Sequence, residues 1–405
     1  VTVLKDASAA SLYGSRAANG VVLITTKNGK LGKASVSFHT QFGLASVPKA
    51  YDMMSSAEFY RMKWLSHYEQ KREAGESPEK AAVSANAFAQ GAITFNPYNV
   101  DQPIDANGNL VNGERIIVDT DWQDEIYQLA YGGDYNLSVS GAAGKLPYRV
   151  STGFYHQQGV LKTDQMNRVS GDFSINPRLF DSHLAIDASV KVTATHNRFA
   201  NKDAIGAAVQ FDPTRPVRDN DAKFAPFGGY WAWMDGANLQ TLAPRNPVAL
   251  LQQKEDVSDV FRTISNLKLD YKLHFLPELK LNVNLGYDYA SGKGSVIIPA
   301  ASSLGWQRFT YKQAGKPDEL KSGTNNSYDQ RKRSLLFDFY ANYVKEFSAI
   351  KSRLDVMAGY SYQDWKTYVH NTPDYTYDKT LVSAPPFEYD YPQNTLVSFY
   401  GRLNY

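Results

Sequence analysis

The sequence contains no cysteine, no long apolar run and almost no net charge, and each absence removes a class of protein. Without cysteine there is no disulfide, no thiolate nucleophile and no cysteine-bound zinc. The 43 Lys and Arg balance 41 Asp and Glu, so a formal charge of +2 gives no field that would attract nucleic acid. The strongest apolar runs, such as 21–24, fall far short of the roughly 20 residues that a membrane-spanning helix needs. We therefore expect neither a nucleic-acid partner nor a helical membrane protein.

Signatures of catalysis and metal binding are also missing. The sequence has no G-x-S-x-G elbow, no H-E-x-x-H and no G-x-x-x-x-G-K-[ST] loop, and its seven histidines are scattered. Residues 105–109 resemble the start of a calcium loop, but Leu110 stands where that loop needs glycine and Ile116 where it needs glutamate. We expect a hairpin turn there, and we predict no enzyme activity, no cofactor and no metal site.

Aromatic residues, by contrast, are abundant. They make up 13% of the chain, with 27 Tyr, 20 Phe and 6 Trp. A membrane β-barrel carries aromatic girdles at both interfaces, and because only alternate residues of its strands face lipid, its mean hydropathy can be as low as the -0.43 found here. A soluble carbohydrate-binding β-protein would have a similar composition, so composition leaves both classes open.

Alternation of apolar and polar residues predicts about ten β-strands. In the clearest segment, 278–291, Leu281, Val283 and Leu285 alternate with Asn282 and Asn284. The faces divide into Leu, Val, Phe and Tyr on one side and Lys, Asp, Asn, Ser and Gly on the other, as a wide barrel with lipid outside and a wet lumen requires. The same pattern predicts strands over 34–44, 134–142, 148–157, 166–176, 184–193, 267–273, 335–343, 354–363 and 395–405.

The connections between these strands alternate between long and short. A transmembrane barrel predicts this asymmetry, with tight periplasmic turns and long external loops. A soluble β-sandwich has no reason to keep it over successive hairpins. The predicted fold is a mainly β, transmembrane antiparallel β-barrel, with short turns at 143–147, 177–182, 275–277 and 347–350 and longer connections at 45–133, 158–165, 197–256, 292–327 and 366–394.

The first long connection contains a predicted helix over 55–73. Ser55 and Glu58 have the spacing of a capping box, and Gly75 can end the helix. Phe59, Met62 and Leu65 fall on one face, for which we favour packing on the neighbouring loops over docking of a partner.

Three blocks of sequence resemble the SusC/RagA family of TonB-linked outer-membrane transporters. The first, VLKDASAASLYGSRAANGVVLITTK over 3–27, looks like the family's terminal plug signature and is similar to it at Lys5, Asp6, Tyr13, Gly14, Arg16, Asn19 and Gly20. Read physically, it predicts a short helix, a turn in which Asn19 and Gly20 can take positive φ, and a buried strand. The second block, DTDWQDEI over 119–126, describes a helix start capped by Thr120 or Asp121, for which a catalytic carboxylate pair is the alternative interpretation. The third block covers 148–161, with Arg168 beyond it.

The resemblance implies a barrel of about 22 strands with a plug folded inside. It assigns 1–30 to the C-terminal end of the plug and 31–405 to the N-terminal part of the barrel. Both ends of the chain look cut, at Val1 and Tyr405, so the signal peptide, the energy-coupling box and half of the barrel are expected to lie outside it. The implied setting is the cell outer membrane and its lipid.

The resemblance also implies a SusD-like surface lipoprotein and the TonB complex as partners. The implied function is TonB-energised import of a glycan oligomer or a peptide. A non-transporting receptor or adhesin on the same barrel is one alternative, and a soluble carbohydrate-active β-protein is another.

Candidate substrate contacts lie in two of the long connections. Tyr230, Trp231 and Trp233 belong to the aromatic run 227–233, where exposed rings could stack on sugars, and packing within the loop is an equal alternative. Trp306, in the next long connection, is a weaker case. Arg16 could contact substrate from the plug, although we favour a salt bridge from the plug to the barrel wall.

Overall fold

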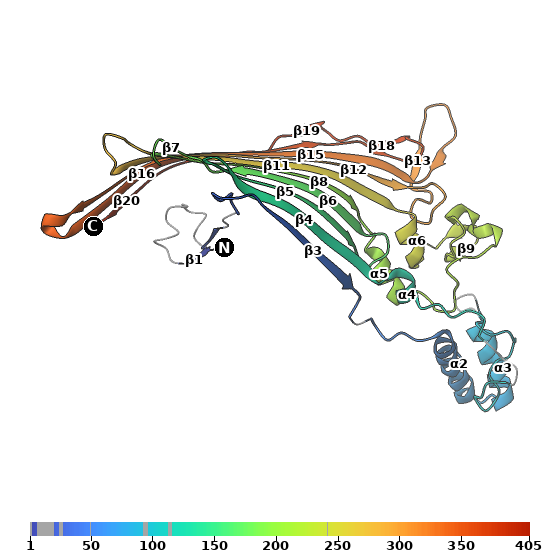
Figure 1. Cartoon of the computed structure of the whole chain (residues 1–405). Coiled ribbons are helices and arrows are strands. Elements are labelled where there is room, and N and C mark those ends of the chain that lie inside the picture. The colour runs from blue at the N-terminus through green and yellow to red at the C-terminus, as the bar shows by residue number, and fades with distance from the viewer. Residues whose placement is uncertain are drawn as a thin grey trace.

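One large curved antiparallel β-sheet makes up most of the molecule (Figure 1). The computed structural model covers the whole chain and describes residues 2–5, 20–23, 27–48, 50–91, 96–111, 116–240 and 242–405. Ten long strands follow one another in chain order across the sheet, each paired with the next. They are β3 (Ser35–Ala45), β4 (Ala130–Ala143), β5 (Leu146–Gln158), β6 (Gln165–Ile175), β8 (Leu184–Arg198), β11 (Glu255–Lys272), β12 (Leu279–Ile298), β15 (Thr324–Phe347), β16 (Ser352–His370) and β20 (Gln393–Asn404).

All ten strands coincide with segments predicted from the sequence, and several are longer than predicted. The strand predicted over 335–343 runs from Thr324 to Phe347, and the one predicted over 267–273 begins at Glu255. The additional residues lie mainly toward the long connections, where both faces of the strands carry polar side chains. Backbone pairing continues there without the period-2 apolar signal, and so the sequence pattern ends before the strand does.

The connections keep the predicted alternation. Because consecutive neighbours are antiparallel, the short connections 144–145, 176–183, 273–278 and 348–351 lie at one end of the sheet, and the long ones, 46–129, 199–254, 299–323 and 371–392, lie at the other end together with 159–164. The tightest turn places Gly144 at φ 63°, a conformation that glycine adopts without strain. We call these ends the turn end and the loop end.

Most of the helices and short strands lie in the connections between the long strands, mainly at the loop end. The helices are α2 (Ser56–Glu73), α3 (Pro78–Ala89), α4 (Trp122–Ile126), α5 (Asp203–Gln210) and α6 (Pro247–Gln252), with 3-10 turns η2 (Ala222–Phe227) and η3 (Ser348–Ile350). The short strands are β1 (Thr2–Leu4) paired with β2 (Val21–Leu23), β7 (Arg178–Leu179), β9 (Met234–Asp235) with β10 (Asn238–Leu239), β13 (Phe309–Tyr311) with β14 (Glu319–Lys321), β17 (Asp374–Tyr375) with β18 (Leu381–Ser383), and β19 (Tyr389–Asp390). Among the described residues, no helix is long and apolar enough to cross a membrane.

The register separates one apolar face of the sheet from one polar face. Residues directly opposite on paired strands share a face, and one row across five strands consists of Leu269, Val283, Phe339, Tyr360 and Phe399. The adjacent row on the other face consists of Lys268, Asn284, Asp338, Ser361 and Ser398. The apolar row is not covered by a second layer within the described chain, since Phe339 is 38% and Phe399 is 80% exposed. A contiguous exposed apolar surface of this kind requires an apolar environment.

The N-terminal segment lies beneath the concave side of the sheet, where it meets the polar face (Figure 1). The Gly29 N–H donates to Oδ1 of Asn176, 3.1 Å away, and Asn176 donates in turn to Asp187. A Cβ added to Gly29 would lie 2.4 Å from the backbone nitrogen of Tyr148, so only glycine permits this approach. Gly20, in the predicted turn, has a φ of 95° as expected.

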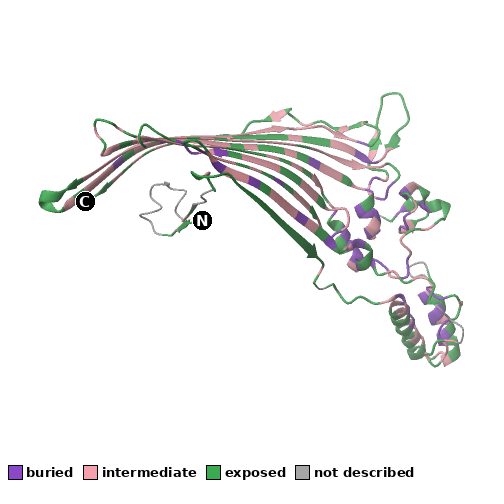
Figure 2. Ribbon diagram, viewed as in Figure 1, coloured by how far each residue is buried: buried purple, intermediate pink, exposed green. Residues whose placement is uncertain are grey.

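Most of the buried apolar residues described lie in the loops, and few, such as Ala130 and Met357, lie in the sheet (Figure 2). One cluster is built from α4, α5, α6 and the aromatic run that includes Phe227 and Trp231. The other joins α2 to α3 through Tyr60 and Trp64. Burial of the Tyr60 side chain raises the pKa of its hydroxyl group to about 12. The loop end therefore has hydrophobic cores of its own, while the strands leave one face open.

Candidate functional site

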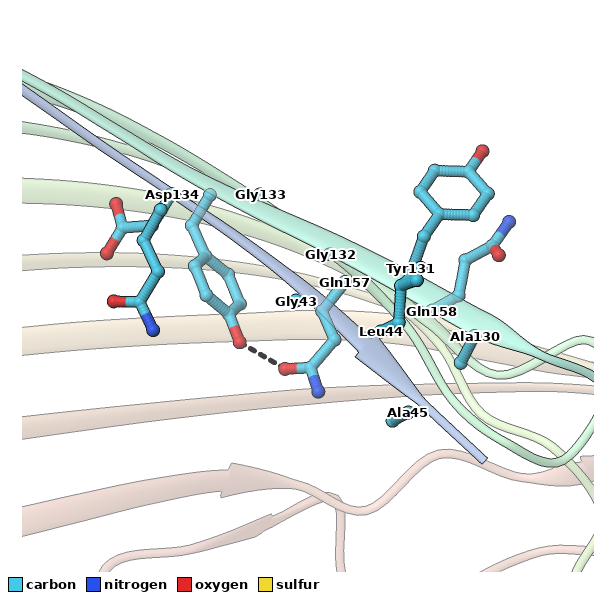
Figure 3. Close-up of a pocket in the computed structure, with 12 residues that line it drawn as sticks. Gly43, Leu44, Ala45, Ala130, Tyr131, Gly132, Gly133, Asp134, Gln157 and Gln158 are labelled. Carbon is cyan, nitrogen blue, oxygen red and sulfur yellow. Dashed lines mark hydrogen bonds between the residues drawn. The ribbon is translucent and has the colours of Figure 1, made fainter. Parts of the chain in front are cut away.

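A hollow of about 190 Å³ opens on the polar face near the loop end of β3, β4 and β5 (Figure 3). Two rows of the register form it. Gln41, Asp134 and Tyr155 lie opposite one another in the first row, and Gly43, Gly132 and Gln157 in the second. Figure 3 shows Asp134 and Gln157 on one side of the sheet and Tyr131 pointing away on the other.

Two paired glycines explain why the wall is hollow here. Gly43 and Gly132 sit directly opposite one another, and a Cβ at Gly43 would meet nothing within 4 Å. Neither residue has a positive φ, so the backbone does not require glycine at these positions. The missing side chains leave space next to the larger residues of the neighbouring row, as close approach of a ligand to a strand requires.

The side chains around the hollow offer a polar ligand one aromatic ring and several hydrogen-bonding groups. The Asp134 carboxylate accepts from Asn136, and the Tyr155 hydroxyl donates to Oε1 of Gln157. The guanidinium of Arg168, on β6, lies 5.0 Å from the centre of the Tyr155 ring in a cation–π contact. A carboxylate and amides provide both acceptors and donors, and hydroxyl groups of a sugar or amide groups of a peptide match them.

The sequence contained part of this site without revealing it. Tyr155 and Gln157 belong to the third family-like block, and Arg168 follows that block. Their meeting with Asp134 and Gly43 depends on the register of four strands, β3 to β6, and the long connection 46–129 separates β3 from β4. The alignment of two glycines across strands is the one signal that could have located the hollow.

The aromatic residues predicted as substrate contacts are packed against one another. Tyr230 is 5% and Trp231 is 9% exposed, and the Trp231 and Trp233 rings meet edge to face with centres 4.8 Å apart. Trp306 is partly buried against Phe227, with ring centres 5.2 Å apart. The packing leaves little ring surface for a sugar to stack on. Substrate contact by these side chains stays a prediction.

The predicted plug signature is described only at its edges. Lys5 is exposed, and Gly20 is half-buried beside β2. Asp6, Tyr13, Gly14, Arg16 and Asn19 lie outside the described residues, and the salt bridge expected of Arg16 stays a prediction.

A buried ion pair organises the aromatic loop. Arg215 Nε lies 3.4 Å from Asp212 Oδ2, and their side chains are only 8% and 4% exposed. The guanidinium also stands over the rings of Trp231 and Trp233, at 4.7 and 5.0 Å from their centres. Burial lowers the pKa of Arg215, and the Asp212 carboxylate opposes that shift.

The second family-like block fastens this loop to its neighbours. Asp121 caps α4 by accepting from the N–H groups of Gln123 and Asp124, which confirms capping by Asp121. The Trp122 indole N–H donates to the carbonyl of Asp212. The two residues before the cap also make bonds, from the Ser56 N–H to Asp119 and from the Thr120 hydroxyl to the carbonyl of Arg215. The block therefore joins α2, α4 and the aromatic loop.

Helix α2 differs from the prediction in the face it buries. The capping box of Ser55 and Glu58 is present, but the buried residues are Tyr60 and Trp64, which pack on α3. Met62 is 40% and Leu65 is 47% exposed, so the helix packs within the loop region as favoured, but through another face than the predicted one. The face was not predicted because a helix with apolar residues on two faces gives no preference between them.

The remaining candidate features have local structural roles. Asp105 accepts from the N–H groups of Asn107 and Asn109, which makes the calcium-like segment a turn, as predicted. Across the described ranges, no group of three His, Asp or Glu side chains is arranged to hold a metal ion.

Comparisons with known proteins identify the family of the chain. No family model matches it. The TonB-dependent receptor SusC of Bacteroides thetaiotaomicron is 31% identical over 435 aligned residues, an alignment that covers 100% of this chain. The chain belongs to the SusC/RagA family of TonB-dependent receptors. It spans only 36% of the length of that SusC relative.

Further relatives agree with this assignment. TonB-dependent receptor P3 of Formosa agariphila is 25% identical over 430 residues and covers 100% of the chain, which spans 35% of that protein. Among solved structures, the RagAB peptide importer in its closed-closed state superimposes with a TM-score of 0.68 at 18% identity, over 99% of this chain and 44% of that one. The ten-strand sheet of this SusC/RagA chain thus has the fold of part of a RagAB barrel.

Proposed function

We propose that the full-length protein imports a glycan oligomer or a peptide across the outer membrane, energised by TonB and assisted by a SusD-like surface lipoprotein. In this proposal, residues 1–30 are the C-terminal end of the plug domain, and residues 31–405 are the N-terminal part of the barrel with its long extracellular loops. The observation that carries the proposal is the division of the sheet into an exposed apolar face and a polar face that meets the N-terminal segment. A wall of this kind separates lipid from a wet or plugged lumen.

The hollow at Gly43 is the part of the wall that we propose contacts the substrate. It lies on the lumen face near the loop end, where an entering molecule would meet the wall before the plug. Its carboxylate, amides and tyrosine ring suit the hydroxyl-rich or amide-rich groups of both substrate classes. The peptide cargo named for the RagAB importer supports peptides as one of the two.

Purification of the full-length protein from outer membranes in mild detergent tests the assembly. We expect mass spectrometry to find a stoichiometric lipoprotein together with a bound glycan or peptide. A barrel recovered alone, without lipoprotein or ligand, would favour a non-transporting receptor or adhesin on the same wall.

A single substitution tests the hollow itself. Gly43→Val should fill it without straining β3, because no atom lies within 4 Å of the new Cβ and valine suits a strand. We expect the affinity for the co-purified ligand, measured by calorimetry on the full-length protein, to fall about tenfold, or about 1.4 kcal/mol. Gly171→Val, which is equally free of neighbours but lies on the apolar face of β6, is the matched control. Equal ligand affinities of the two variants would contradict the proposal that the hollow contacts the substrate.

A further inference from the structure

The apolar face of the sheet ends abruptly before the loop end. On β12 the outward positions from Leu279 to Tyr289 are all apolar or aromatic, and the next outward positions are Ser291 and Lys293. This span matches the roughly 9–11 residues with which a tilted strand crosses the hydrocarbon core of a bilayer. Position 291 and those beyond it therefore stand at the level of the outer headgroups.

Four cations on three neighbouring strands lie at this level or in the row of Tyr289 directly before it. They belong to the apolar face, because Arg333 lies opposite Tyr289 and Lys366, in the row directly beyond the one where Leu335 lies opposite Tyr287. Arg331 lies one row further out, opposite Ser291 and Tyr368. We call this set the outer basic patch: Lys293 on β12, Arg331 and Arg333 on β15, and Lys366 on β16.

The patch has more positive than negative charge. Oδ2 of Asp329 lies 3.7 Å from the Lys293 ammonium and 3.3 Å from the Arg331 guanidinium, so one carboxylate is shared between two cations. Asp364 is paired with Arg333 at 3.0 Å, and its side chain is 2% exposed. It also accepts hydrogen bonds from Gln393 and Thr395. Four cations face three carboxylates, because Asp259 of β11, which is bonded to His196, lies directly opposite Lys293. The exposed ends of Lys293 and Arg331 remain accessible at 64% and 45%.

Aromatic rings hold two of these cations in place. The Arg331 guanidinium stands 5.5 Å from the centre of the Tyr368 ring, and the Lys366 ammonium 5.8 Å from that of Tyr391. Contacts of this kind reduce the motion of long side chains while leaving their donors free to bind an anion.

An apolar groove of about 580 Å³ lies directly beyond the patch toward the turn end. It runs across β8, β11, β12 and β15, and its walls include Leu267, Leu285 and Phe337. The small residues Ala188 and Ser265 leave the space between these larger side chains. Tyr287 and Leu335 border the groove and belong to the row next to Tyr289 and Arg333, so groove and patch adjoin.

We propose that the outer basic patch and this groove together bind one anionic, phosphate-bearing lipid of the outer leaflet, with its headgroup on the cations and an acyl chain in the groove. Arginine binds phosphate with two parallel hydrogen bonds, and lysine adds a second positive charge. A free phosphate ion would satisfy the cations but would leave the groove empty. The lipid is favoured because the groove is almost entirely apolar and opens where the hydrocarbon layer must lie.

Native mass spectrometry of the full-length protein, released from outer membranes, tests this site without any transport substrate. We expect the double variant Arg331→Gln/Lys366→Gln to retain at most about one fifth of the anionic, phosphate-bearing lipid that the wild-type protein retains, because it removes half of the cations. This variant keeps the Arg333–Asp364 pair, so the buried carboxylate is not left uncompensated.

The matched control is Lys332→Gln/Lys280→Gln, which removes the same charge from the opposite face of the same sheet. It should retain lipid as the wild-type protein does. Equal loss in both double variants would overturn the proposal, since the effect would then follow net charge alone.

Added probes separate the lipid from its headgroup. Phosphatidylglycerol added to delipidated wild-type protein should bind and should survive an excess of inorganic phosphate, whereas phosphatidylcholine, which carries no net charge, should bind at least about fivefold less. Displacement of phosphatidylglycerol by inorganic phosphate alone would reduce the site to an anion site and contradict the role of the groove. The result is independent of import, so failure here would leave the proposed function standing.

Discussion

Val283→Arg in the full-length protein should lower the free energy of unfolding by roughly 2 to 4 kcal/mol and reduce the amount inserted in the outer membrane. Val283 lies in the middle of the apolar band of β12, between Leu269 and Phe339 on the neighbouring strands. An arginine there would place its charge at the depth of the acyl chains, far from either interface. Urea unfolding of the purified protein in lipid vesicles, with fractionation of outer membranes, measures both effects.

Asn284→Arg is the matched control, one residue further along the same strand. Asn284 faces the polar side and accepts a hydrogen bond of 2.8 Å from Asn266, so its replacement should cost only about 1 kcal/mol. If both arginines were tolerated equally, the assignment of the two faces of the sheet would be wrong.

Arg215→Met should destabilise the aromatic loop by about 3 to 5 kcal/mol, because it leaves the Asp212 carboxylate buried without its cation. The substitution also removes the contacts of the guanidinium with Trp231 and Trp233. We expect the connection 199–254 to become sensitive to protease in intact outer membranes, while the strands that flank it stay protected.

The double variant Asp212→Asn/Arg215→Met separates charge from packing. Removing both charges avoids the uncompensated carboxylate, so the loop should regain a large part of its resistance. Equal protease sensitivity of the single and double variants would mean that the ion pair contributes little and that the ring contacts hold the loop.

Local patterns predicted the strands because burial of one face imposes a period of two on the residues. Val283 and Asn284 show this period clearly, and the short turns are fixed by the distance between paired strands. The same reasoning missed the outer part of β15, from Thr324 to Ser334, where both faces are polar and only backbone bonds define the strand.

Features that depend on contacts distant in sequence were beyond this reasoning. The hollow needs Gly43 and Gly132 to meet across a long connection, and no local signal sets that register. The sequence did not predict which face of α2 would make the main contact, because Tyr60 and Met62 are both apolar enough for a core. The aromatic run around Trp231 was visible in the sequence, but its contact with Arg215 was not. A buried cation has no sequence pattern of its own.

Uptake by whole cells tests the central proposal most directly. The co-purified oligomer, labelled and supplied to cells with the intact gene, should accumulate inside the outer membrane, and accumulation should stop when TonB coupling is disrupted while surface binding persists. Import that continues without TonB, or binding without accumulation in energised cells, would contradict the account of this chain as the wall of an active importer.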